Sequence, residues 1–176
     1  GDHIVVVAPA YQSLHEVGAS LGCQIDAWWP EEEEMEITSS SLGSVKVKYF
    51  RFHPETLRKL LKPYQTKLVV ANFPHNPTGA LPSQDEFRDM VDIIQENGSW
   101  FLVDEMYRGL EHPKNGQFVE PLPTVADCMP RGISLGGVSK SYGLPGLRIG
   151  WLVNRDLNFQ KRVAELKDYT SICPPA

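Results

Sequence analysis

The stretch Ile4-Val5-Val6-Val7-Ala8 is a continuous apolar run that Pro9 ends. A run with no polar alternation is typical of a strand buried on both faces, as in a parallel sheet. Similar apolar runs recur along the chain, and they predict further strands at residues 23–29, 67–72, 100–103, 133–135 and 149–153.

Segments with helical patterns separate the predicted strands. Ser83 and Glu86 have the spacing of a capping box, which marks the start of a helix. The apolar positions that follow recur at helical spacing until Asn97-Gly98 ends the helix. Further helices are expected at residues 12–21, 54–61 and 157–169. This alternation predicts a single α/β domain with a mainly parallel sheet flanked by helices.

The composition is that of a folded globular protein. Of the 176 residues, 41% are hydrophobic and 22% are charged, which excludes intrinsic disorder. The 17 Lys and Arg residues against 22 Asp and Glu residues give a net charge of −5, so there is no basic surplus to bind nucleic acid. No apolar run approaches the length that spans a bilayer, and residues 1–10 lack the charged region and cleavage site of a signal peptide. We therefore expect a cytoplasmic protein with no nucleic-acid or membrane partner.

The cysteines and histidines do not indicate a metal centre or a disulfide framework. Cys23, Cys128 and Cys173 form no CxxC pair, and no two of the five histidines stand at HxxxH spacing. We expect reduced thiols and no metal site.

Two further segments are expected to be structural rather than functional. The acidic run Glu31–Glu34 follows Pro30 and precedes a Ser-rich segment, which is more typical of a solvated loop than of an acidic docking tail. The adjacent Trp28 and Trp29 could line a substrate pocket, but such residues more often belong to the core.

Polar and aromatic side chains collect where the predicted strands end. Ligands bind at the carboxyl ends of the strands in open α/β sheets, so these positions are candidates for a site. The candidates that follow strands are Tyr11, Asn76, Asp104, Tyr107 and Lys140. Each alone has a plainer explanation, such as a packed aromatic ring, a turn, a helix cap or a surface lysine. Arg148, between two apolar residues, would be costly to bury unless it bound an anion.

Together these positions form the motifs of a known family. The segment GVSKSYGLPGLRIG at residues 137–150 is the most specific motif, and it is accompanied by Pro-x-Tyr at 9–11, Asn-Pro-Thr-Gly at 76–79 and Asp-Glu-x-Tyr at 104–107. The chain thereby resembles the large domain of fold-type I pyridoxal-phosphate enzymes, in particular the class I and II aminotransferases. The resemblance covers the whole chain but only the middle of a family member. It implies that residues 1–176 are a single partial large domain, which binds the cofactor, without the N-terminal segment and the C-terminal small domain.

The resemblance implies a catalytic centre made of Lys140, Asp104 and Tyr107. Lys140 matches the lysine that forms a Schiff base with the aldehyde of pyridoxal 5′-phosphate and then moves the substrate's proton. Asp104 matches the carboxylate that keeps the pyridine nitrogen protonated. Asn76 and Tyr107 match the partners of the cofactor's phenolic oxygen. A cis bond between Asn76 and Pro77 is expected, because the loop has to turn sharply to aim Asn76.

Three further residues match contacts of the family with the cofactor. Tyr11 matches the aromatic ring that stacks on the pyridine face, and Ser139 and Arg148 match ligands of the phosphate. The chain departs from the family at Gly137, where many relatives have a phosphate-binding serine. The helix start that binds the phosphate and the arginine that clamps the substrate carboxylate are expected to lie outside this chain.

The function that the resemblance implies is that of a pyridoxal-phosphate-dependent aminotransferase, which transfers an amino group between an amino acid and a 2-oxo acid. The full-length protein is expected to be a homodimer. The isolated piece is expected to be inactive, because the clamp that orients the substrate is missing. Two alternatives stay open: a related pyridoxal-phosphate lyase, decarboxylase or cyclase that acts on an amino acid, and a non-catalytic truncated scaffold domain.

Overall fold

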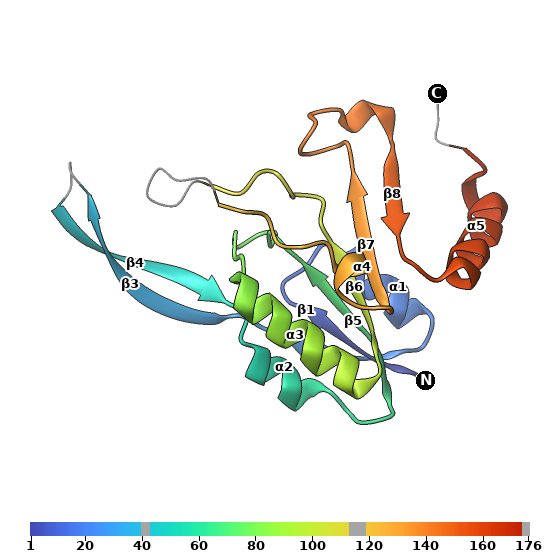
Figure 1. Cartoon of the computed structure of the whole chain (residues 1–176), viewed down its shortest axis with the longest axis horizontal. Helices are drawn as coiled ribbons and strands as arrows, with labels where there is room; N and C mark the ends of the chain where they lie inside the picture. The colour runs from blue at the N-terminus through green and yellow to red at the C-terminus, as the bar shows by residue number, and fades with distance from the viewer. Residues whose placement is uncertain (40–42, 113–118, 174–176) are drawn as a thin grey trace.

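The computed structural model describes residues 1–39, 43–112 and 119–173. Its centre is a six-stranded sheet in the order β2-β1-β5-β6-β7-β8 (Figure 1). The strands are β1 (His3–Val7), β2 (Gln24–Trp28), β5 (Thr66–Asn72), β6 (Trp100–Asp104), β7 (Gly132–Gly137) and β8 (Gly150–Val153). All neighbouring pairs are parallel except the last, in which β8 runs antiparallel to β7. The prediction of an α/β domain with a mainly parallel sheet is confirmed.

Helices lie on both faces of this sheet, and they are α1 (Ser13–Ser20), α2 (Pro54–Leu60), α3 (Gln84–Asn97) and α4 (Val125–Cys128). A 3-10 turn η1 lies at Pro145–Leu147, and the last helix, α5 (Leu157–Ser171), stands to one side of the sheet and buries none of its residues (Figure 1). Alternate residues of β1 separate the two layers, because successive side chains of a strand point to opposite faces. Val5 and Val7 pack into the larger core with α2 and α3, whereas Ile4 and Val6 pack with Leu14 of α1. Figure 1 shows α2 and α3 side by side along one face.

The predicted limits of α3 are confirmed. Ser83 Oγ accepts a hydrogen bond from the Glu86 backbone N–H at 3.2 Å, and Glu86 Oε2 accepts one from the Ser83 N–H at 2.7 Å. Gly98 ends the helix with a φ of 74°, a left-handed conformation that suits glycine. The side chains that α3 buries against the sheet are Phe87, Met90, Val91, Ile93 and Ile94.

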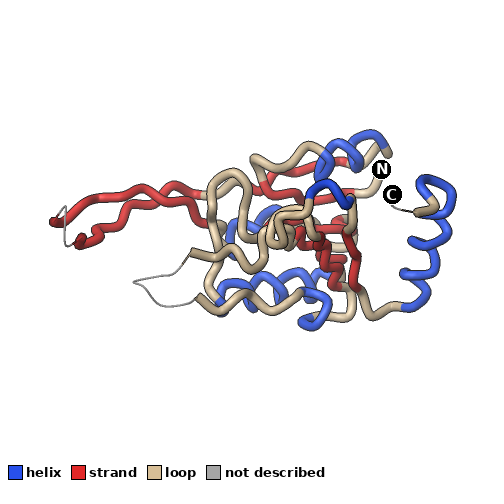
Figure 2. The backbone as a smooth tube through the Cα atoms, turned by 90° about the horizontal axis from the view of Figure 1, so that it is seen from above, coloured by secondary structure: helices blue, strands red, loops and turns tan. Residues whose placement is uncertain are grey.

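The prediction that Glu31–Glu34 is a solvated loop is wrong. These residues begin β3 (Glu31–Ser39), which pairs antiparallel with β4 (Gly43–Arg51). The two strands form a ribbon that projects from the rest of the molecule (Figures 1 and 2).

Charge pairing across the ribbon explains why an acidic run forms a strand. Glu32 and Lys48 form an ion pair at 2.7 Å, and Glu33 lies 3.6 Å from Arg51. Opposite charges on facing strands are favourable, so repulsion along one strand is offset by the other strand.

Other sequence expectations have mixed outcomes. Trp28 is buried in the core, as expected, but Trp29 is 59% exposed. The segment that contains α4 has no predicted helix, because a single turn carries too little periodicity to be recognised. None of the described helices is long and apolar enough to cross a membrane.

Candidate active site

Three central parallel strands end close together at one edge of the sheet. Asn72, the last residue of β5, pairs with Asp104, the last residue of β6, and Asp104 pairs with Leu135 of β7. The segments that follow these strands therefore start next to one another (Figure 1). They carry most of the site residues that the sequence predicts.

Asp104 is a half-buried carboxylate at this edge. Its Oδ1 accepts a hydrogen bond from the Met106 backbone N–H at 2.9 Å. Burial raises the pKa of Asp104 above its usual value, the Met106 N–H opposes this effect, and the nearby charge of Glu105 adds to it. A cationic N–H group next to the carboxylate would favour its ionised form.

Asn72 holds the loop of Asn76 against Asp104. The Asn72 amide donates a hydrogen bond from Nδ2 to the Asp104 carbonyl at 2.8 Å, and its Oδ1 accepts one from the Asn76 backbone N–H, also at 2.8 Å. The expected cis bond between Asn76 and Pro77 is confirmed.

Lys140 lies beside Tyr107. The Lys140 Nζ is 5.8 Å from the centroid of the Tyr107 ring, within the range of a cation–π contact. The Ser141 hydroxyl donates a hydrogen bond to the Arg108 carbonyl, which ties the lysine segment to the turn that follows β6. Lys140 itself is exposed to solvent.

A cavity of 830 Å³ opens beside Asn76 and Tyr107. Its walls are residues 74–83, residues 49–51 of β4 and residues 110–112, together with Glu86. The volume lies in the range of small-molecule sites, which is about 300–1,000 Å³.

Ser139 and Arg148 line a second hollow, of 610 Å³, between β8 and α5. Arg148 Nη1 donates a hydrogen bond to the Pro145 carbonyl at 3.1 Å, and within the described parts of the chain the guanidinium has no carboxylate at ion-pair distance. Its φ of 51° is left-handed, and such a conformation costs a non-glycine residue about 1–3 kcal/mol. Met106 also lines this hollow, so it adjoins the turn that carries Tyr107.

Tyr11 lies in the segment that follows β1, and its side chain is 66% exposed. Tyr11, Asp104 and Lys140 line neither of the two hollows. The Tyr11 segment is joined to the others through Pro9, whose carbonyl lies 2.9 Å from His75 Nε2.

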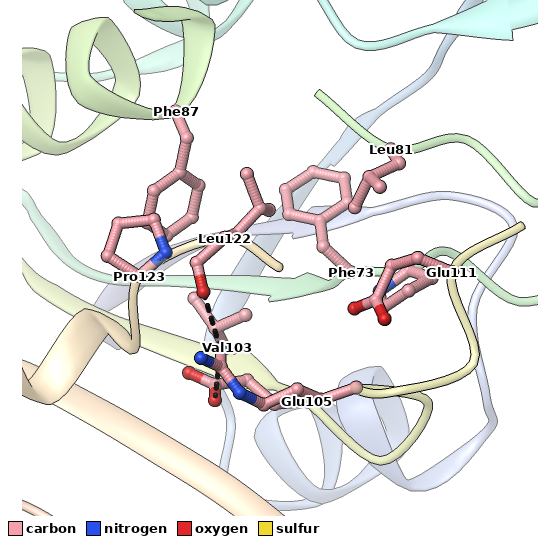
Figure 3. A pocket seen from close by; sticks show the side chains of 10 residues that line it. Phe73, Leu81, Phe87, Val103, Glu105, Glu111, Leu122 and Pro123 are labelled. Carbon is pink, nitrogen blue, oxygen red and sulfur yellow. Dashed lines mark hydrogen bonds and ion pairs between the residues drawn. The ribbon is translucent and has the colours of Figure 1, made fainter. Parts of the chain in front are cut away.

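Glu105 anchors the turn that follows β6, because it binds residues of both β7 and the start of α4. Its Oε1 accepts hydrogen bonds from the hydroxyls of Thr124 at 3.0 Å and Ser134 at 2.8 Å. Arg108 lies 3.5 Å from the other carboxylate oxygen and donates to the Leu122 carbonyl at 2.6 Å (Figure 3). The cavity between these groups and the core measures 10 Å³, which is enough for about one water molecule and too small for a ligand.

The sequence assigns no role to four residues that organise this site: Asn72, His75, Glu105 and Ser141. Asn72 is the last residue of a buried strand and His75 lies in the loop that follows it, and this position is the signal that could have identified them. Glu105 and Ser141 adjoin Asp104 and Lys140, but their partners are distant in sequence. Among the described residues, no cluster of three or more His, Cys, Asp or Glu side chains could hold a metal ion.

Comparison with known proteins gives a family match over almost the whole chain. The sequence profile described as "Aminotransferase class I and II" matches residues 1–171. Capreomycidine synthase from Streptomyces vinaceus is 31% identical over 174 residues, which cover 97% of this chain and 39% of that protein. A probable aspartate/prephenate aminotransferase from Rhizobium leguminosarum bv. phaseoli is 30% identical over 152 residues, which cover 86% of this chain and 34% of that protein.

Solved structures agree with the sequence matches. A PLP-dependent aminotransferase from Streptococcus suis superposes with a TM-score of 0.76 at 31% identity, covering 99% of this chain and 40% of that chain. Aspartate aminotransferase from Thermus thermophilus superposes with a TM-score of 0.77 at 22% identity, covering 99% of this chain and 40% of that chain, which supports the fold alone. The chain thus spans about two fifths of the length of these relatives.

Proposed function

Because the chain belongs to the class I and II aminotransferases, we propose that it is part of a pyridoxal-phosphate-dependent enzyme that transfers an amino group between an amino acid and a 2-oxo acid. Pyridoxal 5′-phosphate is the cofactor that the family and its solved relatives support. One observation carries the proposal: Asn76, Asp104 and the Tyr107–Lys140 pair come from separate segments and meet at one edge of the sheet.

The donor set at this edge fits the cofactor. Asp104 is a half-buried acid whose pKa burial raises, so a neighbouring protonated ring nitrogen would relieve an unfavourable charge. Arg148 and Ser139 line one hollow and offer a guanidinium and a hydroxyl, which suit a phosphate. Lys140 supplies the primary amine that an aldehyde requires.

Bound here, pyridoxal phosphate would supply an aldehyde that condenses with amines and a protonated ring that accepts the electron pair left at the substrate Cα. Lys140 Nζ would take the proton from Cα and later return one, as a general base and then a general acid. Asp104 would hold the proton on the ring nitrogen. Asn76 and Tyr107 would donate hydrogen bonds to the phenolic oxygen and keep it ionised.

Three residues would orient the cofactor without touching the reacting atoms. Tyr11 would stack on the ring face, where offset aromatic contacts contribute about 0.5–1.5 kcal/mol beyond burial. Ser139 and Arg148 would hold the phosphate by charge-assisted hydrogen bonds.

For the whole protein we infer a larger, cytoplasmic homodimer in which residues 1–176 are part of the cofactor-binding domain. The open position of the site supports a larger assembly around it, since Tyr11, Lys140 and Arg148 are all exposed. Enzymes exclude water from such centres, so further residues must cover these side chains during the reaction. The 176 residues alone are therefore expected to be inactive.

A second candidate keeps the cofactor and changes the bond that is broken or formed. Its support is that capreomycidine synthase, at 31% identity, does not bear the name of an aminotransferase. Product analysis of the full-length protein separates the two candidates. Transfer of isotopic nitrogen from a labelled amino acid to a 2-oxo acid supports transamination, and an unsaturated, decarboxylated or cyclic product without nitrogen transfer supports the second candidate.

Reductive trapping tests the proposed amine. The chain is incubated with pyridoxal phosphate and reduced with borohydride, and its intact mass is measured. We expect one adduct, mapped to Lys140, absent in Lys140→Ala and retained in Lys59→Ala, which removes an exposed lysine of α2. Equal amounts of adduct in Lys140→Ala and Lys59→Ala would contradict a preformed site at Lys140. The non-catalytic scaffold would then be the remaining interpretation of this chain.

A further inference from the structure

His75 is a buried imidazole that no step of the proposed reaction uses. It is 3% exposed and stands directly before Asn76 in the loop after β5. Its ring packs edge to face against Phe52, with the two centroids 4.7 Å apart. Phe52 in turn packs on Phe73 in the core, so the imidazole has a rigid support.

The partners of His75 decide which ring nitrogen carries the proton. Nε2 lies 2.9 Å from the Pro9 carbonyl, which can only accept, so Nε2–H is the donor. Nδ1 lies 2.7 Å from Thr78 Oγ1, so in the neutral ring Nδ1 accepts the hydroxyl proton of Thr78. Burial lowers the pKa of His75 and the bond to Pro9 partly opposes this, which leaves the ring neutral at neutral pH.

One ring nitrogen thus faces its own loop, and the other faces a separate loop. The bond to Thr78 closes the turn that contains Asn76, and the bond to Pro9 crosses to the segment that ends β1 and carries Tyr11. The two loops are 66 residues apart in sequence at this contact. In the proposed site, one loop carries the Asn76 amide that binds the phenolic oxygen, and the other carries the Tyr11 ring that stacks on the cofactor.

We propose that His75 is a positioning residue, which fixes the Asn76 loop against the Tyr11 loop and so presets two sides of the cofactor site. The effect on cofactor binding rests on the proposed function. The contact between the loops can be tested without cofactor.

Two amide substitutions separate the two hydrogen bonds. A glutamine can place its NH₂ near the position of Nε2 and keep the bond to Pro9, whereas an asparagine reaches only the position of Nδ1 and loses that bond. Both remove the ring, and they differ in size by one methylene group. A histidine that only fills space would therefore give a small general difference in stability between His75→Gln and His75→Asn, with no difference confined to the Pro9 segment.

Hydrogen exchange of the cofactor-free chain is the first measurement. We expect the amides of Ala8 and Leu14, which flank Pro9 and donate hydrogen bonds to the carbonyls of Trp28 and Tyr11, to exchange about fivefold to tenfold faster in His75→Asn than in His75→Gln, the size of effect that one net hydrogen bond gives. Equal exchange in the two variants, or exchange in His75→Asn as slow as in the unmodified chain, would overturn the proposal.

Cofactor affinity is the second measurement, made on the same proteins by fluorescence titration with pyridoxal phosphate. We expect the Kd of His75→Asn to exceed that of His75→Gln by a similar factor, about fivefold to tenfold. If exchange differs but the two Kd values agree, His75 joins the loops without presetting the site, and the proposal fails. If the unmodified chain forms no adduct at Lys140, the proposed function fails instead, and exchange still decides whether His75 joins the loops.

A measurement on the unmodified chain covers the case in which the variants do not fold. Nitrogen-15 shifts of the His75 ring report its tautomer, and we expect a single species protonated at Nε2. A ring protonated at Nδ1 alone, or one that exchanges between tautomers, would show that the bond to Pro9 is not maintained and would overturn the proposal.

Discussion

Asp104 is a residue whose charge is unfavourable in the chain without cofactor. Burial raises its pKa, so the folded chain holds the proton more tightly than the unfolded chain. Below the unfolded pKa both states are protonated, and Asp104 has no effect on stability. As the pH rises through the folded pKa, the ionised group becomes costly in the folded state, and stability falls.

The first prediction concerns Asp104→Asn. We expect this variant to have a higher urea midpoint than the unmodified chain at neutral pH, with the difference disappearing near about pH 3. Asparagine Oδ1 can still accept the Met106 N–H bond, so the local turn is preserved. The same variant should bind pyridoxal phosphate about tenfold more weakly or worse, because a charged hydrogen bond is lost. Lower stability at neutral pH together with unchanged affinity would contradict both roles.

At the scale of residues, the sequence predicts the side chains that are proposed to contact the cofactor. It does not predict the residues that hold those side chains in position. The motif around Lys140 and the acid at Asp104 could be identified because chemistry restricts their residue types. Asn72 and Glu105 act through partners on other strands, at Asp104 and Ser134. Such contacts depend on which strands are neighbours in the sheet, and the order of the strands cannot be derived from a single sequence.

Two elements, α4 and β7, approach so closely that only glycine fits between them. A Cβ atom at Gly132 would overlap the Val125 carbonyl, which belongs to the backbone of α4 and cannot rotate away. We expect Gly132→Ala to lower the free energy of unfolding by about 3 kcal/mol, the upper end of the usual effect of overpacking. The control is Gly146→Ala in η1, where a Cβ atom would meet nothing within 4 Å. Urea denaturation that shows equal losses for both variants would contradict the close approach.

The capping box of α3 gives a prediction for a single helix. Ser83→Ala removes the acceptor for the Glu86 N–H, and we expect a loss of about 1 kcal/mol in the free energy of unfolding. Ser83→Thr keeps the hydroxyl and should retain most of the stability. Comparable losses in the two variants would show that the cap contributes little.

At the scale of elements, the buried central strands and the long helix α3 are the clearest successes. The strands β1, β5, β6 and β7 and the helix α3 are predicted to within a few residues, since burial imposes an apolar pattern on them. The strand β8 and the helices α1 and α5 are also predicted, although they bury few or no residues. The ribbon of β3 and β4 has no such constraint, and its acids are compatible with a strand only because Lys48 and Arg51 lie across from them. The sequence of residues 31–34 alone shows the repulsion between neighbouring carboxylates. It does not show the basic side chains on β4 that offset this repulsion.

For the whole molecule, stability depends on pH through two carboxylates whose pKa values are shifted in opposite directions, since the pKa of Asp104 is raised and that of Asp26 is lowered. Asp26 in β2 lies 2.8 Å from Lys62 Nζ and 3.0 Å from His3 Nε2, and these two groups lower its pKa. A lowered pKa means that the folded state favours the ionised form. Asp26 therefore stabilises the fold above its unfolded pKa, and this contribution is lost as the pH falls through its folded pKa.

The prediction for Asp26→Asn is accordingly the reverse of that for Asp104→Asn. We expect a lower urea midpoint than the unmodified chain at neutral pH, and a difference that narrows as the solution becomes more acidic. Urea denaturation at several pH values measures both variants. A deficit that persists unchanged in acid would indicate lost packing instead of lost charge pairing.

The strand order has a consequence for how the chain is made. After β1 and β2 pair, the strands β5, β6, β7 and β8 follow in the sequence in the same order in which they join one growing edge of the sheet. Among the strands that the structure describes, none has to be inserted between two that have already paired. During synthesis each strand that leaves the ribosome finds its neighbour already exposed, so the sheet can assemble in the direction of translation. Lys140, which follows β7, then emerges onto a surface where Asp104 and Asn76 are already in place.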